Sequence, residues 1–332
     1  MRKILLVLGV ALVFLAFSQK PKPVPIIFDT DIAPDYDDVG AMAMLHALAD
    51  KGEATILATI SCNAFETTVP TLSVLNTYFK RPGIPIGITK KALPNKDCSQ
   101  RWAQAINEKY PHALRSNVAA VEAVQLYRKI LAAQPDQSVT IVSVGFFTNL
   151  ADLLESPPDE FSALTGKELV TKKVKQLVSM AARLDKNDGT EGYEFNVMVD
   201  AAASEKVFAD WPTPVVISGF EIGENVLTGI RLINNKSIIN SPVKDAYEIA
   251  LAKDKNTLGR NSWDQTAVLA AIRGIAPYFN TRKVNFAVAD DGKNVLIPGD
   301  KFTYLTFRKS PAEIATIIED LMMKQPDEIL NF

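Results

Sequence analysis

Five aspartates fall within ten residues near the N-terminus, and carboxylates at this density point to cation chemistry. They are, in order, Asp29, Asp31, Asp35, Asp37 and Asp38. Carboxylates that share a site raise each other's pKa, and a hard divalent cation reverses this by keeping them ionised. Oxygen ligands suit Ca²⁺ or Mg²⁺, whereas zinc would call for histidine or cysteine. The alternative is a solvated acidic loop in which aspartate caps a helix, and capping accounts for one or two of the five.

The acidic run joins a strand-like stretch, Val24–Phe28, to a helix-like one, Asp38–Ala49, and this alternation continues along the chain. Further strand patterns occupy Thr55–Ile60, Pro85–Ile88, Val139–Val144, Val174–Met180, Pro214–Ser218 and Phe302–Phe307. Further helix patterns occupy Val69–Phe79, Ala119–Ala133, Leu150–Leu154, Ala201–Phe208, Val243–Ala252, Asp264–Arg273 and Pro311–Met323. The alternation predicts an α/β protein, a single domain with a mostly parallel central sheet flanked by helices.

Polar turns follow several of the predicted strands, and in a parallel sheet such turns carry the ligands. Beside the acidic run, these turns contain Asn63, Gly145–Asn149, Arg183–Asn196 and Glu221. We therefore expect them to line one rim of the sheet. The chain contains no glycine-rich phosphate loop, which argues against nucleotide-cofactor or kinase chemistry.

The first eighteen residues have the pattern of a secretory signal. Arg2 and Lys3 precede an apolar run, Ile4–Phe17, which ends in small residues at Ser18. A membrane span needs about 20 apolar residues, so this run is short for one. We predict a signal peptide over residues 1–18, a mature domain over 19–332, and export to the periplasm or the exterior. An uncleaved anchor is the alternative, and it would be the only membrane contact.

Composition narrows the classes of partner. The formal net charge of −2 gives no electrostatic case for binding nucleic acid. Hydrophobic residues make up 47 % of the chain, as is ordinary for a packed globular protein. Cys62 and Cys98 are the only cysteines. Export would permit a disulfide between them, and the sequence leaves open whether they pair.

Five ordered motifs resemble those of the nucleoside hydrolase family, the inosine-uridine preferring type of calcium-dependent enzyme that cleaves ribonucleosides. They are Asp29-Thr30-Asp31 with Asp37-Asp38, Asn63, Gly145-Phe146-Phe147-Thr148-Asn149-Leu150, Glu194-Phe195-Asn196 with Asp200, and Trp263-Asp264-Gln265. The likeness covers about Pro25 to Ala315. It implies a Rossmann-like fold, hydrolysis of the N-glycosidic bond to free base and ribose, a small-molecule nucleoside substrate and a homo-oligomer.

The resemblance also implies a role for each matched residue. Breaking the bond builds positive charge on the sugar, and a nucleophilic water must be activated. Asp31 would be the catalytic base for that water and a ligand of Ca²⁺. The other metal ligands would be Asp38, Asp264 and the backbone carbonyl of Thr148. The substrate would be bound by Asp37, Asn63, Glu194, Asn196 and Trp263. Asp29 is expected to order the loop by accepting backbone N–H bonds.

The chain departs from the family pattern in two places. Pro34 and Asp35 look like an insertion in the acidic signature, and Asp35 has no role that carries over. Trp263 stands where many members have the histidine that protonates the departing base. Only His46 and His112 are present in the chain, and neither matches that position. We expect Trp263 to stack on a purine instead.

Two other interpretations remain open at this stage. One is a secreted sugar- or nucleoside-binding protein on the same scaffold with catalysis lost, suggested by the missing histidine. The other treats Asp29 and Asp31 as the nucleophile pair of an aspartyl phosphatase. That mechanism gives no role to Thr148 or to the Glu194–Asn196 motif.

Overall fold

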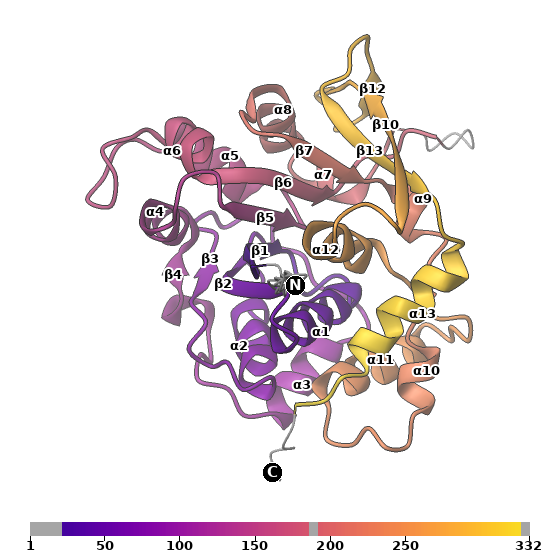
Figure 1. Cartoon of the computed structure of the whole chain (residues 1–332). Coiled ribbons are helices and arrows are strands. Elements are labelled where there is room, and N and C mark those ends of the chain that lie inside the picture. Colours follow the sequence, from indigo (N-terminus) through magenta and orange to yellow (C-terminus); the bar gives the residue numbers. More distant parts are fainter. Residues whose placement is uncertain (1–21, 186–191, 327–332) are drawn as a thin grey trace, which may run out of the picture.

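A nine-stranded sheet forms the centre of the computed structural model, which describes residues 22–185 and 192–326 (Figure 1). The strand order is β10-β13-β7-β6-β5-β1-β2-β3-β4. Every neighbouring pair is parallel except β10 with β13. The strands are β1 (Val24–Thr30), β2 (Ala54–Ser61), β3 (Ile86–Ile88), β4 (Val121–Glu122), β5 (Val139–Ser143), β6 (Val174–Met180), β7 (Val215–Ser218), β10 (Phe279–Val284) and β13 (Phe302–Phe307). The predicted α/β class with a mostly parallel sheet is confirmed.

Helices cover both faces of the sheet. One face carries α1 (Asp37–Asp50), α2 (Thr68–Tyr78), α3 (Trp102–Lys109), α11 (Pro242–Lys253), α12 (Trp263–Arg273) and α13 (Pro311–Met322). The other carries α4 (Ala123–Ala133), α5 (Thr148–Glu155), α6 (Gly166–Lys173) and α8 (Ala201–Asp210). Neighbouring residues of β1, Ile26 and Ile27, belong to the two different core clusters, as expected because side chains alternate along a strand.

Short elements complete the fold around the ends of the strands. They are η1 (Asn117–Ala119), α7 (Phe195–Val199), α9 (Phe220–Gly223), α10 (Ile230–Asn234), the antiparallel ribbon of β8 (Leu227–Thr228) with β9 (Arg260–Asn261), and the hairpin of β11 (Phe286–Val288) with β12 (Asn294–Leu296).

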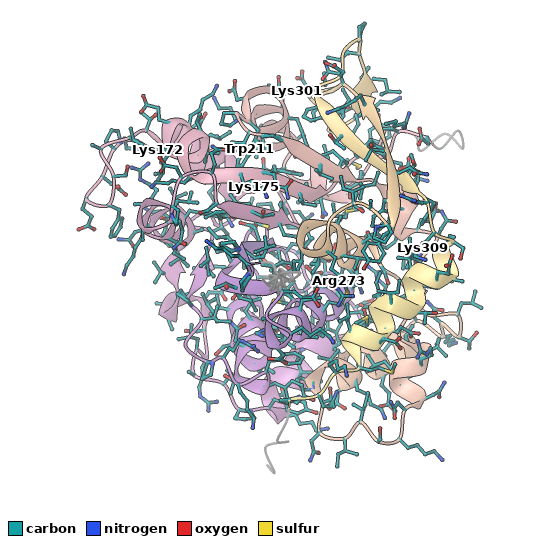
Figure 2. The ribbon with its side chains drawn as sticks, in the orientation of Figure 1. Lys172, Lys175, Trp211, Arg273, Lys301 and Lys309 are labelled. Carbon is teal, nitrogen blue, oxygen red and sulfur yellow. The ribbon has the colours of Figure 1, made fainter. Side chains whose placement is uncertain are left out.

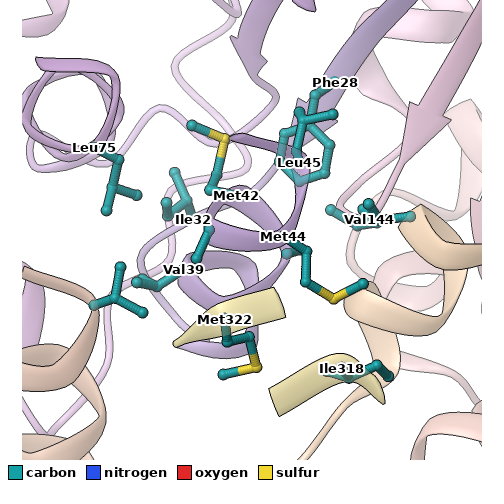
Figure 3. Close-up of a cluster of buried hydrophobic side chains, with 14 of the residues drawn as sticks. Phe28, Ile32, Val39, Met42, Met44, Leu45, Leu75, Val144, Ile318 and Met322 are labelled. Carbon is teal, nitrogen blue, oxygen red and sulfur yellow. The ribbon is translucent and has the colours of Figure 1, made fainter. Parts of the chain in front are cut away.

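Helix α1 is apolar on all sides because it lies inside the protein. Val39, Met42, Met44 and Leu45 are fully buried, and their side chains point in different directions around the helix (Figure 3). Residues of β1, α12 and α13 belong to the same core cluster. The acidic loop is thus fixed between a central strand and a central helix.

One helix starts later than the sequence pattern predicts. Residues Ala119–Ala133 were expected to be helical, but the first part forms the end of η1 and the edge strand β4. Helix α4 begins only after Glu122, whose carboxylate accepts hydrogen bonds from the backbone N–H groups of Val124 and Gln125. Side-chain capping of this kind sets a helix start that hydrophobic periodicity does not reveal.

The far end of α12 is anchored by an ion pair. Arg273, labelled in Figure 2, pairs with Glu53 at 2.7 Å. Glu53 precedes β2, so this contact fixes the helix whose first turn contributes Asp264. The C-terminal end of α12 is therefore tied to the start of β2.

Three sequence-based expectations meet the structure here. The predicted signal peptide, residues 1–18, lies outside the described residues. In the part of the chain that is described, no helix combines the length and hydropathy of a membrane span. Cys62 and Cys98 are both buried and free.

Candidate active site

A pocket of about 200 Å³ opens where the acidic loop after β1 meets the starts of α1 and α12. Ligand pockets for drug-sized molecules span roughly 300–1,000 Å³, so this one suits a small ligand. Its acidic lining consists of Asp31, Asp35, Asp37, Asp38, Glu194 and Asp264. The remaining lining is Val144, Met180, Phe195, Asn196, Phe220, Arg260 and Trp263.

Three of these carboxylates converge tightly. One oxygen each from Asp37, Asp38 and Asp264 lie within 4.8 Å of one another. Asp37 and Asp38 open α1, and Asp264 lies in the first turn of α12. Helix N-termini carry partial positive charge, which offsets part of the repulsion among the acids. Asp38 and Asp264, which the sequence analysis expected to share an ion, thus meet although they lie more than 220 positions apart in the chain. The third member of this cluster is Asp37, which was expected to bind the substrate.

Asp31 borders this cluster. It lines the same pocket and is almost fully buried. Burial, followed by the charge of Asp38, raises its pKa well above the ordinary value. Burial and the neighbouring aspartates likewise raise the pKa of Asp38 and of Asp264. Such a cluster cannot stay fully ionised at neutral pH without a cation.

The residues fit a bound divalent metal ion. The Oδ2 atoms of Asp31 and Asp38 are buried and have no hydrogen-bond partner among the described residues. A buried carboxylate oxygen left without a donor is costly, and metal coordination removes that cost. The donor set is oxygen only, which is the set that hard cations prefer. The pocket therefore has the character of a metal site.

Close backbone packing holds the acidic loop in place. A Cβ at Gly145 would come within 2.4 Å of the Asp31 backbone nitrogen and 2.7 Å of the Cys62 sulfur. Only glycine permits this approach between the turn after β5 and the loop after β1. The glycine of the Gly145–Leu150 motif is therefore required by geometry at this position.

Asp29 lies beneath the pocket and does not line it. Its Oδ2 accepts hydrogen bonds from the Tyr127 hydroxyl at 2.8 Å and the Asn149 amide at 3.0 Å. The expectation that Asp29 accepts backbone N–H bonds is thus corrected, because its partners are side chains from α4 and α5. Burial raises the pKa of Asp29 to about 7.

Glu194 and Asn196, which were expected to bind the substrate, both line the pocket. The Glu194 carboxylate accepts hydrogen bonds from the backbone N–H groups of Asn196 at 3.0 Å and Val197 at 3.1 Å. Burial raises the pKa of Glu194 to about 7. The Asn196 amide donates to the Val144 carbonyl at 3.2 Å. These bonds fix both side chains at the pocket wall.

Asn63 has a different place from the one expected. It is fully buried and is not among the lining residues. Its amide nitrogen donates to the carbonyls of Asp31 at 2.9 Å and Lys96 at 2.8 Å, and its oxygen accepts from the Lys96 backbone N–H at 2.9 Å. In the structure Asn63 therefore braces the acidic loop, and its side-chain groups are occupied by the backbone.

Thr148 is also buried and opens α5. Its hydroxyl donates to an Asp200 carboxylate oxygen at 2.6 Å. This bond explains why Asp200 belongs to the same set of motifs. The assignment of the Thr148 carbonyl as a metal ligand stays a prediction.

Arg260 is a pocket residue that the sequence analysis missed. Its Nη2 lies 2.7 Å from Asp37 Oδ1 and 2.6 Å from Asp35 Oδ1. Burial alone would lower its pKa, but the charges of Asp35 and Asp37 more than offset this and raise it. Asp37 is consequently engaged with an arginine as well as with the acidic cluster. The inserted residue Asp35 also acquires a partner.

Trp263 lines the pocket beside Arg260. The guanidinium carbon of Arg260 lies over the indole, 5.0 Å from its centroid, and over the Tyr36 ring at the same distance. The indole N–H donates to the Phe220 carbonyl at 2.9 Å, and the centroids of the Trp263 and Phe220 rings lie 5.1 Å apart. These contacts form a rigid aromatic wall next to the acidic cluster.

Comparison with known proteins shows the family of this chain. The family model described as inosine-uridine preferring nucleoside hydrolase matches residues 26–321. The chain belongs to this family. A pyrimidine-specific ribonucleoside hydrolase, RihA, of Salmonella schwarzengrund is 32 % identical over 226 residues, which are 66 % of this chain and 67 % of the relative.

Solved structures agree at the level of the fold. The inosine-uridine preferring nucleoside hydrolase of Bacillus anthracis has a TM-score of 0.67 at 16 % identity, over 90 % of this chain and 99 % of that one. The purine-preferring ribonucleoside hydrolase of Gardnerella vaginalis has a TM-score of 0.65 at 17 % identity, over 90 % and 99 %. The family confirms the predicted class of enzyme, an N-ribosyl hydrolase.

Proposed function

We propose that this nucleoside hydrolase uses Ca²⁺ to release free base and ribose from ribonucleosides, with Asp31 as the general base. The observation that carries the proposal is the buried acidic cluster with Asp31 at its border, because Asp31 and Asp38 each have a buried oxygen without a hydrogen-bond partner among the described residues. Catalytic machinery and metal ligands need groups that the fold leaves unsatisfied.

Asp31 takes a proton from the attacking water as the water oxygen bonds to the anomeric carbon. General base catalysis of this kind contributes about 10²–10⁴-fold. Charge on the sugar grows as the N-glycosidic bond breaks, and the surrounding carboxylates stabilise that positive charge. Glu194, Asn196 and Asp37, which all line the pocket, hold the sugar hydroxyls.

The metal ligands would be the carboxylates of Asp31, Asp38 and Asp264 with the carbonyl of Thr148. When bound, the ion lowers the pKa of water and binds hydroxyl oxygens of the sugar. Calcium is preferred to magnesium because it accepts many oxygen ligands in irregular geometry. Asn63 supports the site from outside by holding the Asp31 backbone.

Purine nucleosides are the preferred substrates in this proposal. The reason is the aromatic area that Trp263 and Phe220 present at the pocket wall. The names of similar proteins point both ways, since RihA is called pyrimidine-specific and the Gardnerella enzyme purine-preferring. Base preference therefore rests on this chain's own wall.

A substrate panel tests the proposal. Inosine, adenosine, guanosine, uridine and cytidine are incubated with the purified chain in excess Ca²⁺ and in excess chelator, and free base is measured by chromatography. Base release that requires Ca²⁺ and is faster for purines is the expected result. Tight ribose binding without base release would instead indicate a binding protein.

We also propose export, supported by the charged and apolar pattern of residues 1–18. N-terminal sequencing of the protein from a native host should give a mature chain that starts at residue 19. A homo-oligomer is proposed from the family resemblance, and light scattering of the purified chain measures it.

A further inference from the structure

The pocket has no imidazole among its lining residues to protonate the departing base. His46 is fully buried, with its Nε2 3.1 Å from the Asn76 amide oxygen and its ring stacked on Phe79. His112 borders a separate surface hollow beside α3, and its Nδ1 lies 2.8 Å from the Tyr110 carbonyl. These are the two histidines of the chain. Base departure must therefore depend on another group.

Arg260 is held at the pocket wall more firmly than ordinary surface arginines. Its Nε and Nη2 lie 3.0 and 2.7 Å from Asp37 Oδ1, and Nη2 also contacts Asp35. The rings of Tyr36 and Trp263 each lie 5.0 Å from its guanidinium carbon. Two carboxylates and two rings thus fix the plane of the guanidinium and its position along the wall.

One edge of this guanidinium remains available. Arginine has five N–H donors, and those of Nε and Nη2 point to Asp35 and Asp37. Among the described residues, no acceptor lies within hydrogen-bond distance of Nη1. The side chain of Arg260 is one of the pocket-lining groups. The fold therefore leaves the two N–H donors of Nη1 without an acceptor from the described part of the chain, on a side chain that is held in place at the pocket wall.

We propose that Arg260 activates the leaving group, with its Nη1 N–H donating a hydrogen bond to a ring nitrogen or oxo acceptor of the departing base. This inference rests on the proposed hydrolase function. Negative charge develops on the base as the N-glycosidic bond breaks, and a fixed donor stabilises that charge. A hydrogen bond of this kind grows stronger as the charge develops, so it lowers the barrier.

Electron and proton balance is simple in this scheme. The electron pair of the broken bond goes to the base, and the water oxygen forms the new bond to the anomeric carbon. The proton of that water passes to Asp31. A guanidinium does not give up its proton, so the base takes its proton from solvent after cleavage.

The inserted residue Asp35 gains a positioning role in the same scheme. Its carboxylate contacts Nη2 of Arg260 on the pocket rim. With Asp35 and Asp37 both beside it, the guanidinium carries no excess positive charge. Arg260 is thus expected to recognise an acceptor on a neutral base, without favouring phosphorylated nucleosides.

The test compares two substrates that differ only in how much help the leaving group needs. Inosine carries a poor leaving group, whereas the leaving group of 4-nitrophenyl ribofuranoside is the stable 4-nitrophenolate. Arg260→Met should lower kcat for inosine about 100-fold, the typical effect of removing one such donor. The aryl riboside should lose less than about 3-fold by the same reasoning. Asp35→Asn should show the same selectivity with a smaller loss.

Arg282→Met is the matched control. Arg282 also lies over an aromatic ring, Tyr304 at 4.9 Å, and pairs with Asp185, but it does not line the pocket. This variant should leave both rates unchanged. Calcium binding is measured as the rise in unfolding temperature when Ca²⁺ is added. This rise should be the same for wild type and Arg260→Met.

Equal losses on both substrates, or a weakened calcium response in Arg260→Met, would show that Arg260 acts only through Asp37 and would overturn the inference. If Arg260→Met does not fold, Arg260→Lys, which keeps the charge but not the planar fork, should still slow inosine selectively. A wild-type protein that cleaves neither substrate would count against the proposed function itself.

Discussion

The proposed mechanism divides the pocket into a sugar end and a base end, and these two ends are built in different ways. The sugar end consists of carboxylates on the ends of β1, α1 and α12, all parts of the central scaffold. The base end consists of Arg260, Trp263 and Phe220, and Arg260 lies on a two-residue strand outside the main sheet. The first end carries buried charge that needs a cation, and the second carries a paired cation between rings. In this scheme α12 serves both ends, through Asp264 and Trp263, whereas the β8–β9 ribbon contributes Arg260 to the base end only.

The largest expected effect lies at the sugar end. Asp31→Asn should lower kcat about 10³-fold on inosine and on the aryl riboside alike, because it removes the base that activates water. Steady-state kinetics on both substrates measures this. Asp136→Asn, at an exposed ion pair with Lys173, is the control and should retain full activity. A loss confined to inosine would place Asp31 at the base end.

Calcium should reverse the order of stability between wild type and Asp264→Asn. In chelator the variant should unfold a few degrees higher than wild type, because one charge leaves a crowded acidic cluster. In excess Ca²⁺ the wild type should be the more stable, because binding to the folded state adds stability that the variant loses. Differential scanning calorimetry in both buffers gives the four values. An unchanged order in both buffers would contradict a metal ligand at this position.

Trp263 tests the base end. Trp263→Leu should lower kcat/KM for inosine about 10-fold, since stacking on an aromatic side chain is worth roughly 1–3 kcal/mol per base. Uridine, with its smaller ring, should lose less. Trp263→Phe should restore much of the inosine activity. Equal losses for inosine and uridine would rule out stacking as the basis of a purine preference.

His46 lies outside both ends of the pocket, and its titration should make the stability of the protein depend on pH. Burial lowers its pKa from 6.5 to about 3, so the unfolded chain takes up a proton that the folded chain does not. The neutral, buried His46 therefore leaves the free energy of unfolding undiminished above pH 6.5, and this free energy falls as the pH drops from 6.5 toward 3. At pH 5 the loss is about 2 kcal/mol.

His46→Gln should remove this loss while keeping an amide beside Asn76. Urea unfolding of both proteins at pH 7.5 and pH 5, in excess Ca²⁺, measures the difference. Stability that falls equally in both proteins would show that His46 does not titrate as its burial indicates.

The same contrast explains what the sequence could predict. Asp31, Asp37 and Asp38 lie in one short acidic run after a clear strand, and Asp264 opens a periodic helix. Their meeting at one pocket could therefore be expected from the sheet topology. Arg260 has no such signal, because β9 is two residues long and its partners lie more than 220 positions away. The ion pairs of Arg260 with Asp35 and Asp37 form only once the chain has folded, so no local sequence pattern could predict them.

Other misses have similar physical causes. Asn63 was expected to bind the substrate, but its side-chain amide is hydrogen-bonded to the backbone of two loops. Because backbone groups are the same in every residue, a sequence motif does not reveal partners of this kind. Strand β10 was not predicted, because its residues are largely polar at the sheet edge. Helix α4 starts at a side-chain cap that periodicity does not mark.

Cys62 makes the rigidity of this centre measurable. Its thiol is fully buried, donates to the Thr30 carbonyl, and lies where a Cβ on Gly145 would have to be. A thiol reagent can reach that sulfur only when the surrounding structure opens, and the turn after β5 and the loop that bears Asp31 are both part of those surroundings. The labelling rate of Cys62 therefore measures how often this region opens. The change in that rate when Ca²⁺ is added measures how strongly the ion stabilises the closed arrangement of the two loops.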